Sequence, residues 1–219
     1  MRRWTYPDYA VVVGPYHLLY KGISPLVRTR QLRTLGRAIM TELESLVIAE
    51  RSDAIYLRAA PLRAGDRAAL VPAWVPTYLS KMGRRADMAG LRLPGTEWVA
   101  VDRDGRVVPA GPILDIPSAA LDELPAEGPP DKVFVDEPVD VDAVFAFTDM
   151  EDDPFPEVTR GFALHRLLGA TANLERVGDW APDALRRLVE RADARGIGFP
   201  PPRDLLDGLA ERLGEGRAA

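Results

Sequence analysis

The chain has 219 residues, 47% of them hydrophobic, with no cysteine and only two histidines. This length suits one large domain or two small ones, and it can bury an apolar core without covalent cross-links. The absence of cysteine excludes a disulfide-stabilised scaffold, a thiol nucleophile and a cysteine-ligated metal centre, and two histidines leave little for another kind of metal site. The net charge of −5 argues against a general nucleic-acid-binding protein.

The sequence contains no apolar run near the roughly 18 residues that a membrane-spanning helix needs. The first ten residues, MRRWTYPDYA, carry positive charge, but no apolar segment follows them as it would in a secretory signal. We therefore expect a cytoplasmic protein of bacterial type that does not associate with a membrane.

Charged residues are unevenly distributed along the chain. Residues 1–40 contain seven Lys or Arg and one Asp, whereas residues 115–157 contain fourteen Asp or Glu and one Lys. Such runs most often form solvated surfaces. The alternative is that the basic segment binds an acidic partner, or that copies of the chain associate through opposite charges.

The N-terminal part predicts two strands followed by a long helix. Residues 9–13 and 16–20 are rich in strand-forming residues and are separated by Gly14-Pro15. From about residue 29 to residue 50, apolar residues recur at intervals of three and four, which predicts an amphipathic helix. The basic residues at its beginning oppose the helix dipole, so they are candidates for contact with a partner: Arg28, Arg30, Arg33 and Arg37.

The middle of the chain predicts several short strands. We expect strands at 55–60, 68–71, 97–101, 107–108, 132–135 and 141–147, with turns at 65–66 and 102–105. Two prolines predict a loop over residues 72–77, after which 78–89 predicts a helix ended by Gly90, and 118–124 a short helix.

The C-terminal part predicts helices. We expect helices at 159–174, 182–194 and 204–213, a strand at 197–199, Gly196 as a helix stop, and a frayed tail at 214–219. The fold class is α/β, with α+β as the alternative: a mixed sheet flanked by helices. We expect one domain over residues 1–213, with N-terminal strands in 1–28, a sheet core in 29–158 and closing helices in 159–213.

Residues 55–108 follow an order of strand, turn, proline-ended strand, loop, glycine-ended helix, acidic strand and hairpin. The segments concerned are YLRAA (56–60), LVP (70–72), GLRL (90–93), TEWVAV (96–101) and DGRV (104–107). This order resembles the HPr kinase/phosphorylase-like family, whose kinase domain shares its fold with phosphoenolpyruvate carboxykinases. The resemblance extends over about residues 30–213. It implies a phosphate-binding loop directly after LVP.

That loop is degenerate in this chain. Its pattern is G-x-x-x-x-G-K-[S/T], because backbone N–H groups and the lysine bind phosphate oxygens and the hydroxyl holds Mg²⁺. The two glycine positions, the lysine position and the hydroxyl position fall on Ala73, Tyr78, Leu79 and Ser80. Prolines at positions 72 and 76 supply no N–H group. The resemblance therefore implies a kinase fold without its phosphate cradle.

Other family positions are also altered. The acidic pair of the later strand is reduced to Thr96-Glu97, and Arg58 stands at the position of the family's histidine. Lys81 lies two positions beyond the required lysine, which turns it by roughly 200° on a helix. We expect no phosphoryl transfer, since positioning and electrostatic stabilisation supply most of that catalysis.

Two function classes remain open. The first is a non-catalytic binding or scaffold protein without a cofactor. The resemblance implies that its protein or peptide partner belongs to a biosynthetic pathway. The second is a diverged small-molecule or protein kinase that uses ATP and Mg²⁺ through Ser80, Lys81 and Glu97. A structural subunit of a homo-oligomer is a weaker third possibility.

The former phosphate-loop segment is now apolar and aromatic. Trp74, Val75 and Tyr78 either fill a disused pocket or contact a partner. The acidic run 149–153 lacks the spacing of a calcium loop, and His165 lies in the middle of a predicted helix. We therefore assign no catalytic residue and no metal ligand.

Overall fold

The computed structural model describes residues 2–6, 9–79, 91–92, 98–108, 138–149 and 153–214. Contacts group the described residues up to Ile48 in one compact unit and those from Ala49 onward in a second. Three sheets and several helices confirm the α/β class. The prediction of one domain over residues 1–213 stays a prediction, and the two units are described separately.

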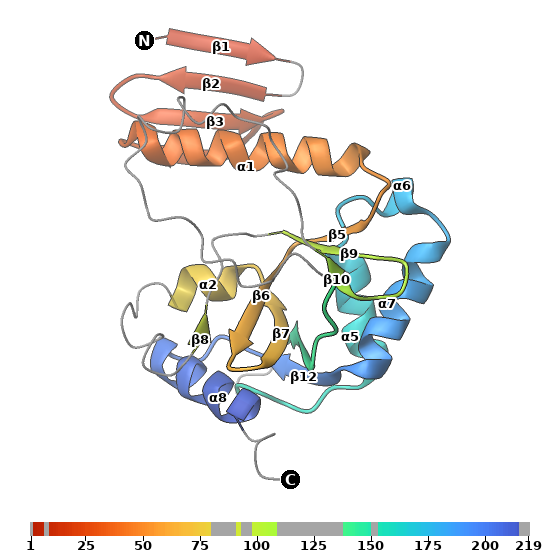
Figure 1. Ribbon diagram of the computed structural model, residues 1–219. Coiled ribbons are helices and arrows are strands. Elements are labelled where there is room, and N and C mark those ends of the chain that lie inside the picture. Colours follow the sequence, from red (N-terminus) through yellow and green to blue (C-terminus); the bar gives the residue numbers. More distant parts are fainter. Residues whose placement is uncertain are drawn as a thin grey trace. The chain divides into compact units, whose positions relative to one another are not determined.

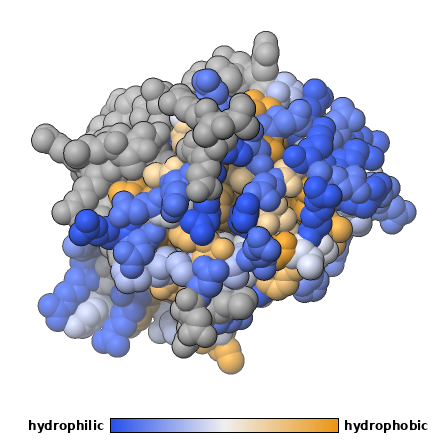
Figure 2. Space-filling view, turned by 90° about the horizontal axis from the view of Figure 1, so that it is seen from below, coloured by the Kyte–Doolittle hydropathy of each residue, from blue (hydrophilic) through white to orange (hydrophobic). Residues whose placement is uncertain are grey.

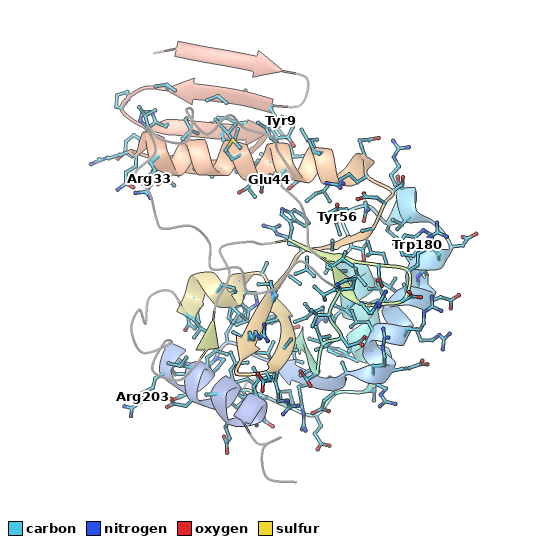
Figure 3. The ribbon with its side chains drawn as sticks, viewed as in Figure 1. Tyr9, Arg33, Glu44, Tyr56, Trp180 and Arg203 are labelled. Atoms are coloured by element: carbon cyan, nitrogen blue, oxygen red, sulfur yellow. The ribbon has the colours of Figure 1, made fainter. Side chains whose placement is uncertain are left out.

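The first unit is an antiparallel meander with a long helix. Its strands pair in chain order: β1 (Arg2–Tyr6), β2 (Tyr9–Val13), β3 (His17–Lys21) and β4 (Ser24–Thr29), followed by α1 (Leu32–Glu50). Tyr9 points toward α1 (Figure 3), where its hydroxyl donates to Glu42 at 3.0 Å. The predicted strands and long helix are confirmed. Sequence reasoning missed β1 and β4, the strands with one neighbour each.

The second unit contains two sheets (Figure 1). The antiparallel three-stranded sheet has the order β10 (Val107–Val108), β9 (Val99–Val101), β5 (Ile55–Leu57). The five-stranded sheet has the order β12 (Asp193–Ile197), β11 (Ala143–Phe147), β7 (Arg67–Pro72), β6 (Ala59–Ala64), β8 (Leu91–Arg92). Strand β11 runs parallel to β12 and β7, and the other pairs are antiparallel.

Helices cover both faces of the five-stranded sheet (Figure 1). They are α2 (Trp74–Leu79) and α8 (Pro202–Gly214) on one face, and α5 (Arg160–Gly169), α6 (Leu174–Val177) and α7 (Trp180–Arg191) on the other. Side chains alternate along β11, so Phe145 packs with α8 residues while Val144 packs with α7 residues. Figure 2 shows polar residues over much of the visible described surface, with apolar residues between them.

The C-terminal elements differ from the prediction at two places. The helix predicted over 159–174 begins as expected, because Thr159 Oγ1 accepts from the Phe162 N–H at 3.1 Å, but it ends at Gly169. The helix predicted over 182–194 ends at Arg191. The strand predicted over 197–199 lies earlier in the chain, as β12, with Gly196 inside it. A Cβ at position 196 would lie 2.8 Å from the carbonyl oxygen of Pro156, so this glycine allows close packing of two segments.

Several predicted elements lie wholly or largely outside the described residues. They are the helix over 78–89, the short helix 118–124, the strand 132–135 and the tail 214–219. The strand predicted over 55–60 is divided in two, since β5 pairs with β9 whereas β6 pairs with β7.

Tyr56 in β5 is a buried ionisable group, with 1% of its surface exposed. Its hydroxyl donates to Asp53 at 3.3 Å, and burial raises the pKa of Tyr56 from 10.0 to about 12. The folded protein holds this proton more tightly than the unfolded chain does. The contribution of Tyr56 to the free energy of unfolding is therefore complete below about pH 10 and is lost as the pH rises toward about 12. Urea unfolding across this range should show a smaller decline for Tyr56→Phe. An equal decline in both proteins would contradict the assignment.

Candidate binding site

Four aromatic side chains gather beside the carboxyl end of β11. We call Trp74, Tyr78, Phe147 and Phe199 the aromatic cluster. They come from three separate segments: α2, which follows β7, the last residue of β11, and the segment after β12. Because β11 runs parallel to both β7 and β12, the segments that follow these three strands meet at one edge of the sheet.

The rings of the aromatic cluster contact one another directly. The Trp74 ring lies 4.4 Å from that of Phe199, 5.8 Å from that of Tyr78 and 6.4 Å from that of Phe147, measured between centroids. Phe147 and Phe199 are 4.9 Å apart. Phe199 is 66% exposed, while the other three rings are partly buried. The cluster thus has an anchored base and an exposed edge.

The base of the aromatic cluster is fixed by the core and by one hydrogen bond. Val75 and Leu79 are fully buried in the core between the sheet and α8. The Tyr78 hydroxyl donates to the carbonyl oxygen of Pro200 at 3.2 Å. Val75 was a candidate partner contact in the sequence analysis. It instead packs α2 against the core and presents no surface to a partner.

The connection between β7 and α2 is a single residue, Ala73. We expected a loop over residues 72–77, but a helix begins at Trp74. Pro76 is its third residue, where the missing N–H has no partner within the helix in any case. A phosphate-binding loop needs several residues whose N–H groups turn inward, and only Ala73 intervenes here.

One cation lies over the aromatic cluster. The Arg166 guanidinium of α5 is 5.9 Å from the Phe147 ring and 5.1 Å from the Phe162 ring. Its Nη2 atom is 3.9 Å from a carboxylate oxygen of Asp149, which is 84% exposed. The ion pair is therefore long and solvated, and the arginine is held mainly by the rings.

The basic residues at the beginning of the chain form a separate group in the first unit. Arg28 lies in β4 and Arg30 precedes α1, so neither belongs to the predicted helix. Both guanidinium groups stack on the exposed Tyr16 ring, at 4.5 and 4.8 Å, and Arg30 Nη2 donates to the Tyr16 hydroxyl at 2.6 Å. Arg33 lies near the beginning of α1 (Figure 3). The Arg37 side chain lies outside the described part.

The structure does not describe the three residues through which the kinase alternative would bind ATP and Mg²⁺. Ser80, Lys81 and Glu97 all lie outside the described ranges. Arg58 lies between β5 and β6 and His165 lies in α5, and both residues are exposed. Among the described residues, no group of three or more His, Cys, Asp or Glu side chains is placed to hold a metal ion.

Sequence reasoning missed Phe147, Phe199 and Arg166. An aromatic residue ends the predicted strand 141–147 and another ends 197–199, which was the available signal. The sequence did not show that these two strands are adjacent and parallel, and this pairing is what brings the two rings together. Arg166 carried no signal, since nothing in a helical pattern indicates which ring an arginine will cover.

Comparisons with known proteins returned no similarity: no family model, no curated protein and no solved structure matches the chain. The resemblance to HPr kinases accordingly stays a prediction. No helix among the described residues is both long and apolar enough to span a membrane.

Proposed function

We propose that this chain is a non-catalytic binding protein whose aromatic cluster holds a peptide segment of a partner. The observation that carries the proposal is the convergence of four aromatic rings from three segments at the carboxyl edge of the sheet, with Phe199 two-thirds exposed. Ligands of open α/β sheets bind at this edge. Exposed aromatic side chains packed on a rigid base are typical anchors of protein interfaces.

The exposure of Phe199 favours binding over a purely structural role. A ring that only filled a disused pocket would be buried, since leaving it in water forfeits most of its hydrophobic stabilisation. Phe199 instead covers Trp74 with one part of its surface and leaves most of the rest to solvent. A peptide side chain laid against these rings would bury that remaining area.

The β7–α2 connection supports binding without phosphoryl transfer. Pro72 has no N–H group, and Ala73 alone separates the strand from the helix. The proposed function requires neither ATP nor Mg²⁺. The partner we propose is a protein or peptide of a biosynthetic pathway, met in the cytoplasm. Nucleic acid is disfavoured by the net charge of −5.

The experiment is a selection of random twelve-residue peptides on the purified full chain, followed by calorimetric titration of the tightest-binding peptide. Phe199→Ser should weaken binding about tenfold or more, because it removes the exposed edge of the aromatic cluster. Thermal unfolding should change little, since the ring is mostly in water.

The matched control is Leu174→Ser, which removes another exposed apolar side chain of the same unit, 38% exposed at the beginning of α6. It should leave affinity within about twofold. Failure to select any binding peptide, or equal affinity for Phe199→Ser and the unaltered chain, would contradict the proposal. Micromolar binding of ATP with Mg²⁺ in the same instrument would favour the kinase alternative instead.

A further inference from the structure

Three buried polar atoms without partners belong to residues at or next to the end of β11. Trp74 Nε1, Thr148 Oγ1 and Arg166 Nε are each buried and have no hydrogen-bond partner among the described residues. Trp74 and Arg166 contact the Phe147 ring, and Thr148 is the next residue of the chain. A buried polar group without a partner costs folding free energy, so such groups are rare, and three at one strand end call for an explanation.

The three atoms have the same hydrogen-bonding character. The indole and guanidinium N–H groups can only donate, and the threonine hydroxyl can donate. Thr148 is 4% exposed and its backbone N–H donates to the Ile197 carbonyl at 3.0 Å, so its position is fixed and only the hydroxyl lacks a partner. The missing group is therefore an acceptor.

The local charge indicates what kind of acceptor fits. Arg166 supplies one positive charge, and Asp149 opposes it with a carboxylate oxygen 3.9 Å from Nη2. A doubly charged phosphate would find little net positive charge here. A single carboxylate, which accepts through two oxygens, matches one guanidinium and a neighbouring hydroxyl, and it can displace the solvated Asp149.

We propose that the end of β11 is a carboxylate subsite, in which Thr148 Oγ1 and Arg166 Nε donate to a carboxylate of the bound peptide while an adjacent apolar side chain rests on the aromatic cluster. The inference rests on the proposed function and names the chemistry of its partner. The carboxylate belongs either to the peptide's C-terminus or to an Asp or Glu side chain. Both sources offer the same acceptor.

The test uses the tightest-binding peptide selected above, made in three forms: unaltered, with an amidated C-terminus, and with each Asp or Glu replaced by Asn or Gln. Loss of affinity of about tenfold on amidation, or on one of the replacements, is expected and identifies the source of the carboxylate. If no modification changes the affinity while Phe199→Ser still weakens it, the subsite is wrong and the proposed function stands. If no peptide binds at all, both are overturned.

Two variants locate the subsite on the protein. Thr148→Val removes only the hydroxyl, and Arg166→Met removes the charge while keeping contact with the rings. Each should lower affinity about tenfold for the carboxylate form of the peptide and little for its neutral form. Thr148→Val should leave the unliganded chain as stable as before or more so, because a hydroxyl without a partner is replaced by an apolar group.

The matched control is Thr171→Val, since the Thr171 hydroxyl already donates to the Leu167 carbonyl at 3.0 Å. It should leave both peptide affinities unchanged. Equal effects of Thr148→Val on the carboxylate and neutral peptides would overturn the proposal, because they would show a structural role in place of a carboxylate contact.

Discussion

Replacement of Asn173 by alanine should cost about 3 to 5 kcal/mol of unfolding free energy, the largest effect that we expect from a single hydrogen-bonding side chain. Asn173 is 1% exposed. Its Oδ1 accepts from the Tyr56 N–H at 2.9 Å, and its Nδ2 donates to the carbonyl oxygens of Arg51 and Ala54 at 2.9 and 2.7 Å. Alanine would leave all three backbone groups without this partner.

Asn173→Asp separates the loss of these hydrogen bonds from the loss of volume. The aspartate keeps the shape and still accepts from the Tyr56 N–H, but its second oxygen faces two carbonyl oxygens, and all three repel one another. Protonation restores one donor, so this variant should recover part of its stability as the pH falls toward about 4. Urea unfolding at pH 7 and pH 4 checks both statements. A loss below about 1 kcal/mol for Asn173→Ala would contradict the role of the side chain.

Gly105→Ala should be nearly as damaging, at about 3 kcal/mol or more. Gly105 lies in the turn between β9 and β10 with φ +76°, a conformation that side chains disfavour. A Cβ would also lie 2.4 Å from the Ala184 carbonyl oxygen and 2.8 Å from the Leu188 nitrogen, both backbone atoms of α7. Backbone atoms of a packed helix cannot turn aside, so the hairpin would have to move off α7.

The matched control is Gly178→Ala in the same unit. Gly178 has φ +63°, but nothing lies within 4 Å of its ideal Cβ. This variant should lose only the conformational term, about 1 to 3 kcal/mol at φ +63° and ψ −142°, and therefore less than Gly105→Ala. Thermal unfolding of both variants gives the comparison, and equal losses would show that contact with α7 contributes nothing.

The hairpin that packs on α7 is also joined by backbone hydrogen bonds to a residue far along the chain. Arg187 Nη2 donates to the Arg103 carbonyl at 2.6 Å, and the Arg103 guanidinium stacks on Trp180 at 5.1 Å, at the beginning of α7 (Figure 3). Val107 and Val139 exchange backbone hydrogen bonds at 2.7 and 2.8 Å, although 31 residues of chain separate them. Gly105→Ala would disturb this closure as well.

Local sequence patterns predicted most of the regular elements. Alternation and glycine-proline punctuation predicted β2, β3, β7 and the β9–β10 hairpin, and apolar periodicity predicted α1, α7 and α8. The errors fall where local preference and tertiary pairing disagree. Gly196 follows a helical pattern and was therefore predicted to end a helix. Residues 193–197 instead form a strand, because they make hydrogen bonds with β11.

The candidate site was predicted in part. Trp74, Val75 and Tyr78 were predicted either to fill a disused pocket or to contact a partner. Trp74 and Tyr78 are partly buried in the aromatic cluster, whereas Val75 is directed into the core by the turn of α2. Phe147, Phe199 and Arg166 enter the site only because β11 and β12 pair in parallel and α5 packs beside their ends. No pattern within a single segment contains that information.

By itself, the sequence determined the α/β class, the lack of cysteine chemistry and the absence of a G-x-x-x-x-G-K-[S/T] pattern, because these depend on composition and on neighbouring residues. The tertiary structure decided which side chains meet: it gathered rings from three segments at one sheet edge and left three buried donors there without acceptors. The reason is that periodicity fixes the face on which a residue lies, whereas contact between distant segments depends on strand order and register.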